Sequence, residues 1–263
     1  MMKALLSVSF GTSYEDTRAK TIDVINERLA AAFPDRAFYS AWTSNRIVER
    51  VRVERGELHD TLEEAFGRLA ADGVDDVVVA TTCLMSGHEM RKIAGFAKDW
   101  AAGDGARTVR VADPLLTSEA DRVAMAAAVC EEFSSVPDDA ALLLMGHGSP
   151  KGPNEVYSQM RDSLAALGHP NFTIATVEGE PVFDDAVSIL EKMGASRVVV
   201  APFMFVAGDH AINDMAGDDD QSWANMLIAR GFEVEVVMKG LGEYPAVQQL
   251  VVDHAKAAAC LAE

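Results

Sequence analysis

The fold of this chain is decided by one pattern that occurs twice, VVVATTCLMSGHE at residues 77–89 and VVVAPFMFVAGDH at residues 198–210. In each copy a run of valines, which favours a buried strand, leads through a glycine to a side chain that can bind metal or carry a proton. When the two copies are aligned, Glu89 falls on His210. The repeat therefore predicts a duplicated fold with a carboxylate and an imidazole at matching strand ends.

A second pair of segments supports the duplication. ALLSVSFGTS at residues 4–13 resembles ALLLMGHGSP at residues 141–150, so that Phe10 falls on His147. Both segments begin with a short apolar run, which is typical of a buried strand. Two similar halves with His and Glu at their strand ends suggest a cleft between the halves that holds a metal ion.

Short apolar runs alternate with longer amphipathic stretches along the whole chain. Runs that are apolar throughout are typical of strands covered by helices on both faces, and therefore of parallel sheets. The predicted strands are 3–9, 36–42, 74–82, 107–112, 140–146, 171–177, 197–205 and 232–238. The predicted helices are 14–33, 45–72, 88–102, 118–134, 153–167, 181–194, 211–230 and 243–261. This order predicts an α/β fold of two similar halves, each a parallel four-stranded sheet flanked by helices, over residues 1–134 and 139–263.

The composition excludes several classes of function. The 263 residues include 41 Asp and Glu against 23 Lys and Arg, a formal net charge of −18. Such a chain is a poor partner for nucleic acid or anionic membranes, whose phosphates need Lys and Arg. The acidic charge is compatible with attracting cations, with simple solubility as the alternative explanation for most of it. No apolar run approaches the roughly 20 residues that span a bilayer, and the first residues lack the pattern of a signal peptide. Three cysteines without a CxxC pair indicate reduced thiols, so we expect a cytoplasmic protein.

The residues after the strands are the candidates for function, because ligands of open parallel sheets bind beyond the carboxyl ends of the strands. His147 lies between two glycines, where an imidazole can bind metal or accept a proton. Glu178 ends an apolar strand, Glu180 follows two residues later, and His210 is a second imidazole at a strand end. Two His with one or two Glu form a ligand set that suits Co, Ni, Fe or Zn.

Weaker signals mark further candidates for substrate binding. Gly11, Thr12 and Ser13 follow the first strand and offer backbone N–H groups to an anion, although a simple turn before a helix explains them equally well. Met85 and Phe205 are candidates for the walls of the cleft, with ordinary core packing as the alternative.

His88 and Glu89 follow the glycine of the first repeat, where they can bind substrate, bind metal or carry protons. An acidic residue at a helix start explains Glu89 equally well. The sequence contains no GxxxxGK[ST], no strand-linked GxGxxG and no GxSxG. We therefore expect no nucleotide cofactor and no hydrolase nucleophile.

Four segments resemble the anaerobic sirohydrochlorin cobalt chelatases, class II chelatases related to ferrochelatase that work without ATP. The segments are SVSFGTS at 7–13, MGHGSP at 145–150, TVEGEP at 176–181 and PFMFVAGDHAINDMAG at 202–217. The resemblance covers nearly the whole chain. It implies a lyase with two α/β halves that inserts Co²⁺, its substrate metal, into sirohydrochlorin in the anaerobic biosynthesis of cobalamin (vitamin B12).

The resemblance also implies roles for individual residues. The metal ligands are His147, Glu178 and His210, and His147 also accepts protons. Glu89, the internal counterpart of His210, takes part in proton removal or metal delivery. The second carboxylate of the VEGEP segment, Glu180, leaves open which of the two glutamates is the ligand.

Sirohydrochlorin is a polycarboxylate, so some basic residues must bind it, and Arg46, Arg52 and Arg91 are the candidates. The ligand types equally suit insertion of iron or nickel into sirohydrochlorin or a related tetrapyrrole. A carrier that binds the tetrapyrrole or the metal without turnover is the alternative outside enzymes. A homo-oligomer is a further expectation from the relatives.

Overall fold

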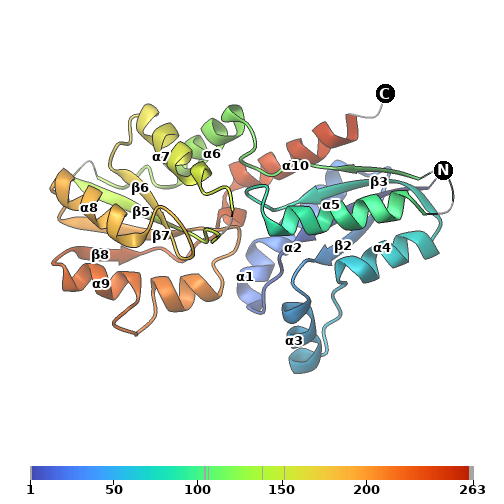
Figure 1. The fold of residues 1–263 in the computed structure, drawn as a ribbon, viewed down its shortest axis with the longest axis horizontal. Helices are drawn as coiled ribbons and strands as arrows, with labels where there is room; N and C mark the ends of the chain where they lie inside the picture. The colour runs from blue at the N-terminus through green and yellow to red at the C-terminus, as the bar shows by residue number, and fades with distance from the viewer. Residues whose placement is uncertain (1, 104, 106, 138, 151, 261–263) are drawn as a thin grey trace. The chain divides into compact units, whose positions relative to one another are not determined.

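The computed structural model (Figure 1) contains two parallel four-stranded sheets, each flanked by helices. It describes residues 2–103, 105, 107–137, 139–150 and 152–260. This is the predicted fold class. The helices of the described residues are too short or too polar to cross a membrane.

The chain divides into two compact units, each built on one sheet. The first unit is Met1–Thr117 with Gln248–Glu263, and the second is Ser118–Val247. The predicted halves 1–134 and 139–263 also hold one sheet each. The division differs in two helices, because α6 (Glu119–Glu132) belongs to the second unit and most of α10 (Pro245–Cys260) to the first.

The first unit has the strand order β2-β1-β3-β4. Its strands are β1 (Met2–Ser9), β2 (Ala37–Trp42), β3 (Val74–Thr81) and β4 (Thr108–Val111). Its helices before α10 are α1 (Glu15–Lys20), α2 (Ile22–Ala32), α3 (Asn45–Arg55), α4 (Leu62–Ala71) and α5 (His88–Ala101). The central strands β1 and β3 are buried over most of their length, because their Val, Leu and Ala side chains pack on both faces of the sheet.

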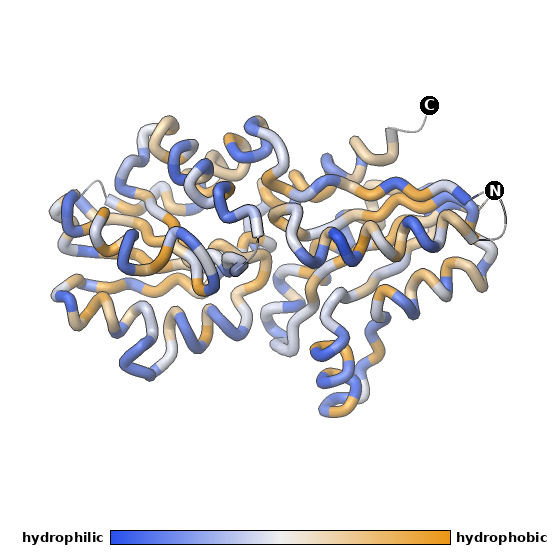
Figure 2. The backbone as a smooth tube through the Cα atoms, viewed as in Figure 1, coloured by the Kyte–Doolittle hydropathy of each residue, from blue (hydrophilic) through white to orange (hydrophobic). Residues whose placement is uncertain are grey.

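The second unit repeats this topology with the order β6-β5-β7-β8. Its strands are β5 (Ala140–Gly146), β6 (Phe172–Thr176), β7 (Arg197–Phe203) and β8 (Glu233–Val236). Its helices besides α6 and the start of α10 are α7 (Glu155–Ala166), α8 (Phe183–Met193), the π-helical turn η1 (Ala211–Met215), α9 (Trp223–Ala229) and the 3₁₀ turn η2 (Leu241–Glu243). Figure 2 shows the strands of both sheets as largely apolar, in agreement with the buried runs in the sequence.

The registers of the strands confirm the internal repeat. Ala4 of β1 lies opposite Val77 of β3, and Ala141 of β5 lies opposite Val198 of β7. These are the residues that begin the two aligned pairs of segments. The two units therefore place equivalent residues at equivalent strand ends.

All eight strands match the predicted ranges to within two residues at each end, but three predicted helices are interrupted. The prediction of one helix over 45–72 was wrong, because two helices occupy this range. Gly56 takes a left-handed conformation that ends α3, and Thr61 starts α4 with a capping box. The predicted helix 14–33 breaks at Thr21. The predicted helix 211–230 consists of η1 and α9, which begins after the N-cap Ser222.

Candidate metal centre

His147 follows β5 and lies between two positions, 146 and 148, that both require glycine. A Cβ on Gly146 would collide with the ring of Tyr157, and a Cβ on Gly148 would lie 2.7 Å from the side chain of Thr176. Gly148 also has φ +75°, a left-handed conformation that strains other residues. Its N–H donates to the hydroxyl of Tyr157 at 3.0 Å, and burial raises the pKa of that phenol to about 12. The backbone of the loop is therefore held by its contacts with Tyr157, while the His147 side chain remains exposed.

Glu178 follows β6 beside this loop. Its backbone N–H donates to the carbonyl oxygen of His147 at 2.8 Å, which extends the pairing of β5 and β6 beyond the sheet. Asn154 ties the same region together: its amide oxygen accepts the N–H of Ser149 at 3.0 Å, and its amide nitrogen donates to the Ser149 carbonyl at 2.7 Å. A Cβ on Gly179 would lie 2.5 Å from the Asn154 amide, so this position also needs a glycine.

His210 stands at the start of η1, one turn before Asp214. Its Nδ1 lies 2.6 Å from the Oδ2 atom of Asp214, and the Nδ1 of His147 lies 2.9 Å from the carbonyl oxygen of Gly148. Both partners accept hydrogen bonds, so in both neutral imidazoles the proton resides on Nδ1. The Nε2 atom of each ring then carries a free lone pair. Histidines that bind metal commonly have this arrangement, in which the other ring nitrogen donates its N–H to a carboxylate or carbonyl oxygen.

Three side chains of the second unit meet at the carboxyl ends of its strands. His147, Glu178 and His210 each offer a ligand atom, and these atoms all lie within 4.8 Å of one another. The two imidazole rings are perpendicular, with centroids 4.8 Å apart. Metal–nitrogen bonds of about 2.1 Å allow at most about 4.2 Å between opposite ligands, so small side-chain rotations suffice to close the set on an ion. Three protein ligands leave positions open on the metal for another molecule.

The second carboxylate of the VEGEP segment lies elsewhere. Glu180 is outside the group of three and lines a hollow of about 460 Å³ together with Glu155 and Asp185. This placement favours Glu178 as the ligand.

The predicted residues of the first unit lie at the corresponding edge of their own sheet. Glu89 is in the first turn of α5, and its Oε2 atom is buried with no hydrogen-bond partner among the described residues. Burial, with a smaller contribution from the charge of Glu89, raises the pKa of the Cys83 thiol to about 11. His88 is exposed at the helix start, and Met85 is half-buried.

The segment after β1 has a clear packing role. A Cβ on Gly11 would lie 2.7 Å from the ring of Trp42. The hydroxyl of Thr12 accepts the backbone N–H two residues later at 3.2 Å, and Arg55 donates to the carbonyl oxygen of Ser13 at 2.5 Å. These contacts fit the turn that was the alternative to substrate binding.

The aromatic side chains at the strand ends differ in exposure. Phe205 is 8% exposed, so most of its ring is packed in the protein, whereas Phe10 is 51% exposed at the position equivalent to His147.

The hydrogen-bond partners of the two imidazoles and of their loops were not predicted from the sequence. Asp214 had a detectable signal, since it lies four residues after His210 and one helical turn brings such residues together. Nothing in the sequence near Tyr157 marks it as the support of the His147 loop.

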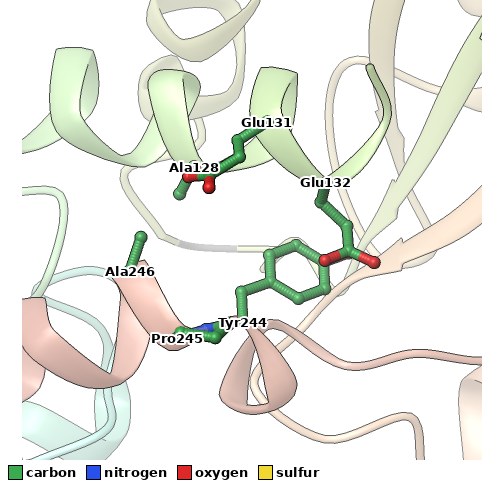
Figure 3. Close-up of a pocket in the computed structure, with 6 residues that line it drawn as sticks. All are labelled: Ala128, Glu131, Glu132, Tyr244, Pro245 and Ala246. Atoms are coloured by element: carbon green, nitrogen blue, oxygen red, sulfur yellow. The ribbon is translucent and has the colours of Figure 1, made fainter. Parts of the chain in front are cut away.

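A separate hollow of about 290 Å³ lies between α6 and the start of α10. Figure 3 shows its lining, which is Ala128, Glu131, Glu132, Tyr244, Pro245 and Ala246. Lys239 pairs with Glu132 at 2.6 Å and stands over the ring of Tyr244. None of the predicted site residues lines this hollow, so it is not part of the metal centre.

Comparisons with known proteins cover the whole described chain. The family model of the cobalt chelatase CbiK matches residues 3–260. A sirohydrochlorin cobaltochelatase from Salmonella typhimurium is 36% identical over 254 residues, which are 97% of this chain and 95% of the relative. The sirohydrochlorin cobaltochelatase CbiKC from Nitratidesulfovibrio vulgaris is 27% identical over 257 residues, 97% of this chain and 90% of the relative.

Two solved structures share the fold. SirB from Bacillus subtilis, solved with Fe³⁺, has a TM-score of 0.67 at 16% identity and covers 99% of this chain and 96% of its own. CbiX, the terminal enzyme of sirohaem biosynthesis in denitrifying bacteria, has a TM-score of 0.57 at 20% identity, over 97% of this chain and 99% of its own. At these identities the likeness concerns the fold alone.

Proposed function

The chain belongs to the cobalt chelatase (CbiK) family, and we propose that it is a sirohydrochlorin cobaltochelatase that inserts Co²⁺ into sirohydrochlorin on the anaerobic route to cobalamin. The enzyme is a metal chelatase, a lyase, and cobalt is its substrate metal. The observation that carries the proposal is the group of His147, Glu178 and His210, whose ligand atoms all lie within 4.8 Å of one another.

The three ligands hold the cation before insertion. Two neutral nitrogens and one carboxylate bind Co²⁺ firmly enough to replace part of its water, yet leave coordination positions for the macrocycle nitrogens. The carboxylate of Asp214 keeps the ring of His210 in place. The loop that contains Gly146 and Gly148 likewise holds His147 in position.

Insertion must also remove the protons from the macrocycle nitrogens that become ligands. As the macrocycle takes over the cobalt ion, Co–N bonds to the protein break, and the Nε2 lone pairs of His147 and His210 are released. Each can then accept one proton that leaves the macrocycle, as a general base does. We assign Glu89 to proton removal or metal delivery as well, on the basis of its equivalence with His210 and its unpaired carboxylate oxygen.

The proposed insertion reaction needs no ATP and takes place in the cytoplasm. The sequence offers no phosphate-binding motif of the P-loop type. Cys83 and Cys130 are free thiols, as suits a reducing compartment. The driving force then comes from the macrocyclic complex itself, and the protein lowers the barrier by binding a distorted macrocycle better than a planar one.

The proposed function is tested by incubating the purified protein with sirohydrochlorin and Co²⁺, with Fe²⁺ and Ni²⁺ in parallel. The absorption of the macrocycle reports insertion. We expect many equivalents of cobalt to be inserted per protein. A spectral change that stops at one equivalent would support a carrier instead, and faster turnover with iron or nickel would change the substrate metal.

Variants connect the activity to the site. His147→Ala and His210→Ala should unfold at the temperature of the unmodified protein but lose most of the insertion activity. His169→Ala, which removes a histidine outside the site, is the control and should remain active. Near-normal rates in both site variants would contradict the assignment.

A further inference from the structure

The internal repeat extends past the strands to the residues that form the metal centre. In the second unit the N–H of Glu178 donates to the carbonyl oxygen of His147 at 2.8 Å. In the first unit the N–H of Ser44 donates to the carbonyl oxygen of Phe10 at 3.3 Å. Phe10 is the counterpart of His147, so Ser44 is the counterpart of Glu178.

The first unit therefore lacks the metal ligands that the second unit has. Phe10, Ser44 and Glu89 occupy the positions of the two imidazoles and the carboxylate. One carboxylate without nitrogen ligands is a poor site for a transition metal. This edge of the first sheet must have another task if it takes part in the reaction.

The charge at this edge is opposite to that of the second unit. The register of β2 on β1, compared with that of β6 on β5, makes Arg46 the counterpart of Glu180. Arg91 and Lys92 lie near the start of α5, whereas the corresponding positions in η1 are uncharged. The first unit thus carries cations in the segments after β2 and β3.

These cations have no carboxylate partners in the described part of the chain. The side chains of Arg46 and Arg91 are exposed and form no hydrogen bond or ion pair there. The ammonium group of Lys92 donates to the carbonyl oxygen of Thr43 and lies 3.5 Å from the amide oxygen of Asn45. Both acceptors are neutral, so the charge of Lys92 is not compensated. The same contacts join the start of α5 to the start of α3, where Arg46 lies.

The remaining arginines of α3 differ from Arg46 in this respect. Along α3 the other arginines, Arg50, Arg52 and Arg55, each have a glutamate within 4.0 Å. Arg52, a candidate for substrate binding from the sequence, is held by Glu64 at 3.0 Å and is therefore occupied. The cations at the helix starts remain available for an external anion.

We propose that Arg46, Arg91 and Lys92 form a carboxylate-binding surface for the acidic side chains of the macrocycle. This inference rests on the proposed function. A polycarboxylate is repelled by a chain of net charge −18 and needs a local region of opposite charge. Arginine binds carboxylates through two parallel hydrogen bonds, and the positive ends of the α3 and α5 dipoles add to the attraction.

The test is a titration of the full-length protein with metal-free sirohydrochlorin. Arg46→Gln and Arg91→Gln should each raise the Kd about three- to tenfold, as expected for a partly exposed charge-assisted contact. Arg46→Lys and Arg91→Lys should recover part of the affinity. Arg50→Gln is the matched control, since it removes the same charge from α3 at an arginine that is already paired with Glu54. Its Kd should stay within about twofold of that of the unmodified protein.

Cobalt binding without macrocycle separates this inference from the proposed function. Co²⁺ affinity should be the same in Arg46→Gln, Arg91→Gln and Arg50→Gln. If the protein inserts no cobalt but the Arg46 and Arg91 variants alone lose affinity for sirohydrochlorin, the proposed function fails and the carboxylate-binding surface stands. If their Kd values equal that of Arg50→Gln, or if cobalt affinity falls together with macrocycle affinity, the inference is overturned.

Discussion

Asp214 determines which nitrogen of His210 is available to the metal, so Asp214→Ala should weaken Co²⁺ binding. The carboxylate oxygen lies 2.6 Å from Nδ1 and keeps the proton there. Without this partner the ring can rotate, and the proton can move to Nε2, where it blocks the ligand lone pair. Removing the partner of a metal-bound histidine usually costs ten- to a hundredfold in affinity or activity. Because the Asp214 side chain is 48% exposed and water can replace it, we expect about tenfold, or about 1.4 kcal/mol.

Two further variants separate the charge of Asp214 from its hydrogen bond. Asp214→Asn retains an oxygen that accepts the Nδ1 proton, so only the charge is lost and the Kd for Co²⁺ should rise about threefold. Asp218→Asn removes the same charge from the next loop, where Asp218 is exposed and has no partner among the described residues. It should leave the Kd unchanged within a factor of about two.

The assay is a titration with Co²⁺ in competition with a chelating dye, together with the initial rate of insertion. Thermal unfolding of the metal-free proteins verifies that the variants fold. If Asp214→Ala binds Co²⁺ as tightly as Asp218→Asn, the hydrogen bond does not orient a ligand, and the reasoning about the tautomer is refuted.

Three more predictions concern the loops and the buried thiol. Glu178→Gln should lower the insertion rate at least about tenfold and Glu180→Gln less than about twofold, since only Glu178 lies in the ligand group; the reverse order of rates would exchange their roles. Gly148→Ala should lower the free energy of unfolding by about 1–3 kcal/mol, measured by denaturant titration, because alanine is strained at φ +75°; an unchanged midpoint would speak against the rigid loop. The pKa of Cys83 is raised from 9.0 to about 11, so its neutral thiol should stabilise the fold fully below about pH 9, with the contribution lost as the pH rises to about 11. With the other two cysteines replaced by serine, iodoacetamide should react slowly with Cys83 at pH 8 and faster after Glu89→Gln, and equal rates would exclude any influence of Glu89.

The strands could be predicted closely from the sequence because their signal is strong and local. Valine-rich runs such as that of β7 are apolar on both faces, which few structures other than a covered strand allow. The helix breaks were missed because they depend on backbone conformation and capping at a few residues. Gly56 ends α3 through its backbone conformation, and the hydrophobic pattern on either side continues without interruption.

The ligand group could be foreseen because topology places it. Parallel strands of one sheet end at the same edge, so His147, Glu178 and His210 were expected to meet. Their supports could not be foreseen in the same way. Tyr157 is nine residues from the loop that it holds, and its role follows from the packing of α7 on β5 and β6. The choice between Arg46 and Arg52 likewise needed the structure, because only the fold reveals which arginine already has a glutamate partner.

The central claim is that His147, Glu178 and His210 bind the cobalt ion through both Nε2 atoms and one carboxylate. A crystal of the protein with Co²⁺, measured on both sides of the cobalt absorption edge, tests this claim directly. The account predicts one anomalous peak about 2.1 Å from the two Nε2 atoms and from a Glu178 oxygen, with Asp214 still bonded to Nδ1 of His210. A peak coordinated by Nδ1 atoms, by Glu180, or away from the three residues would contradict it.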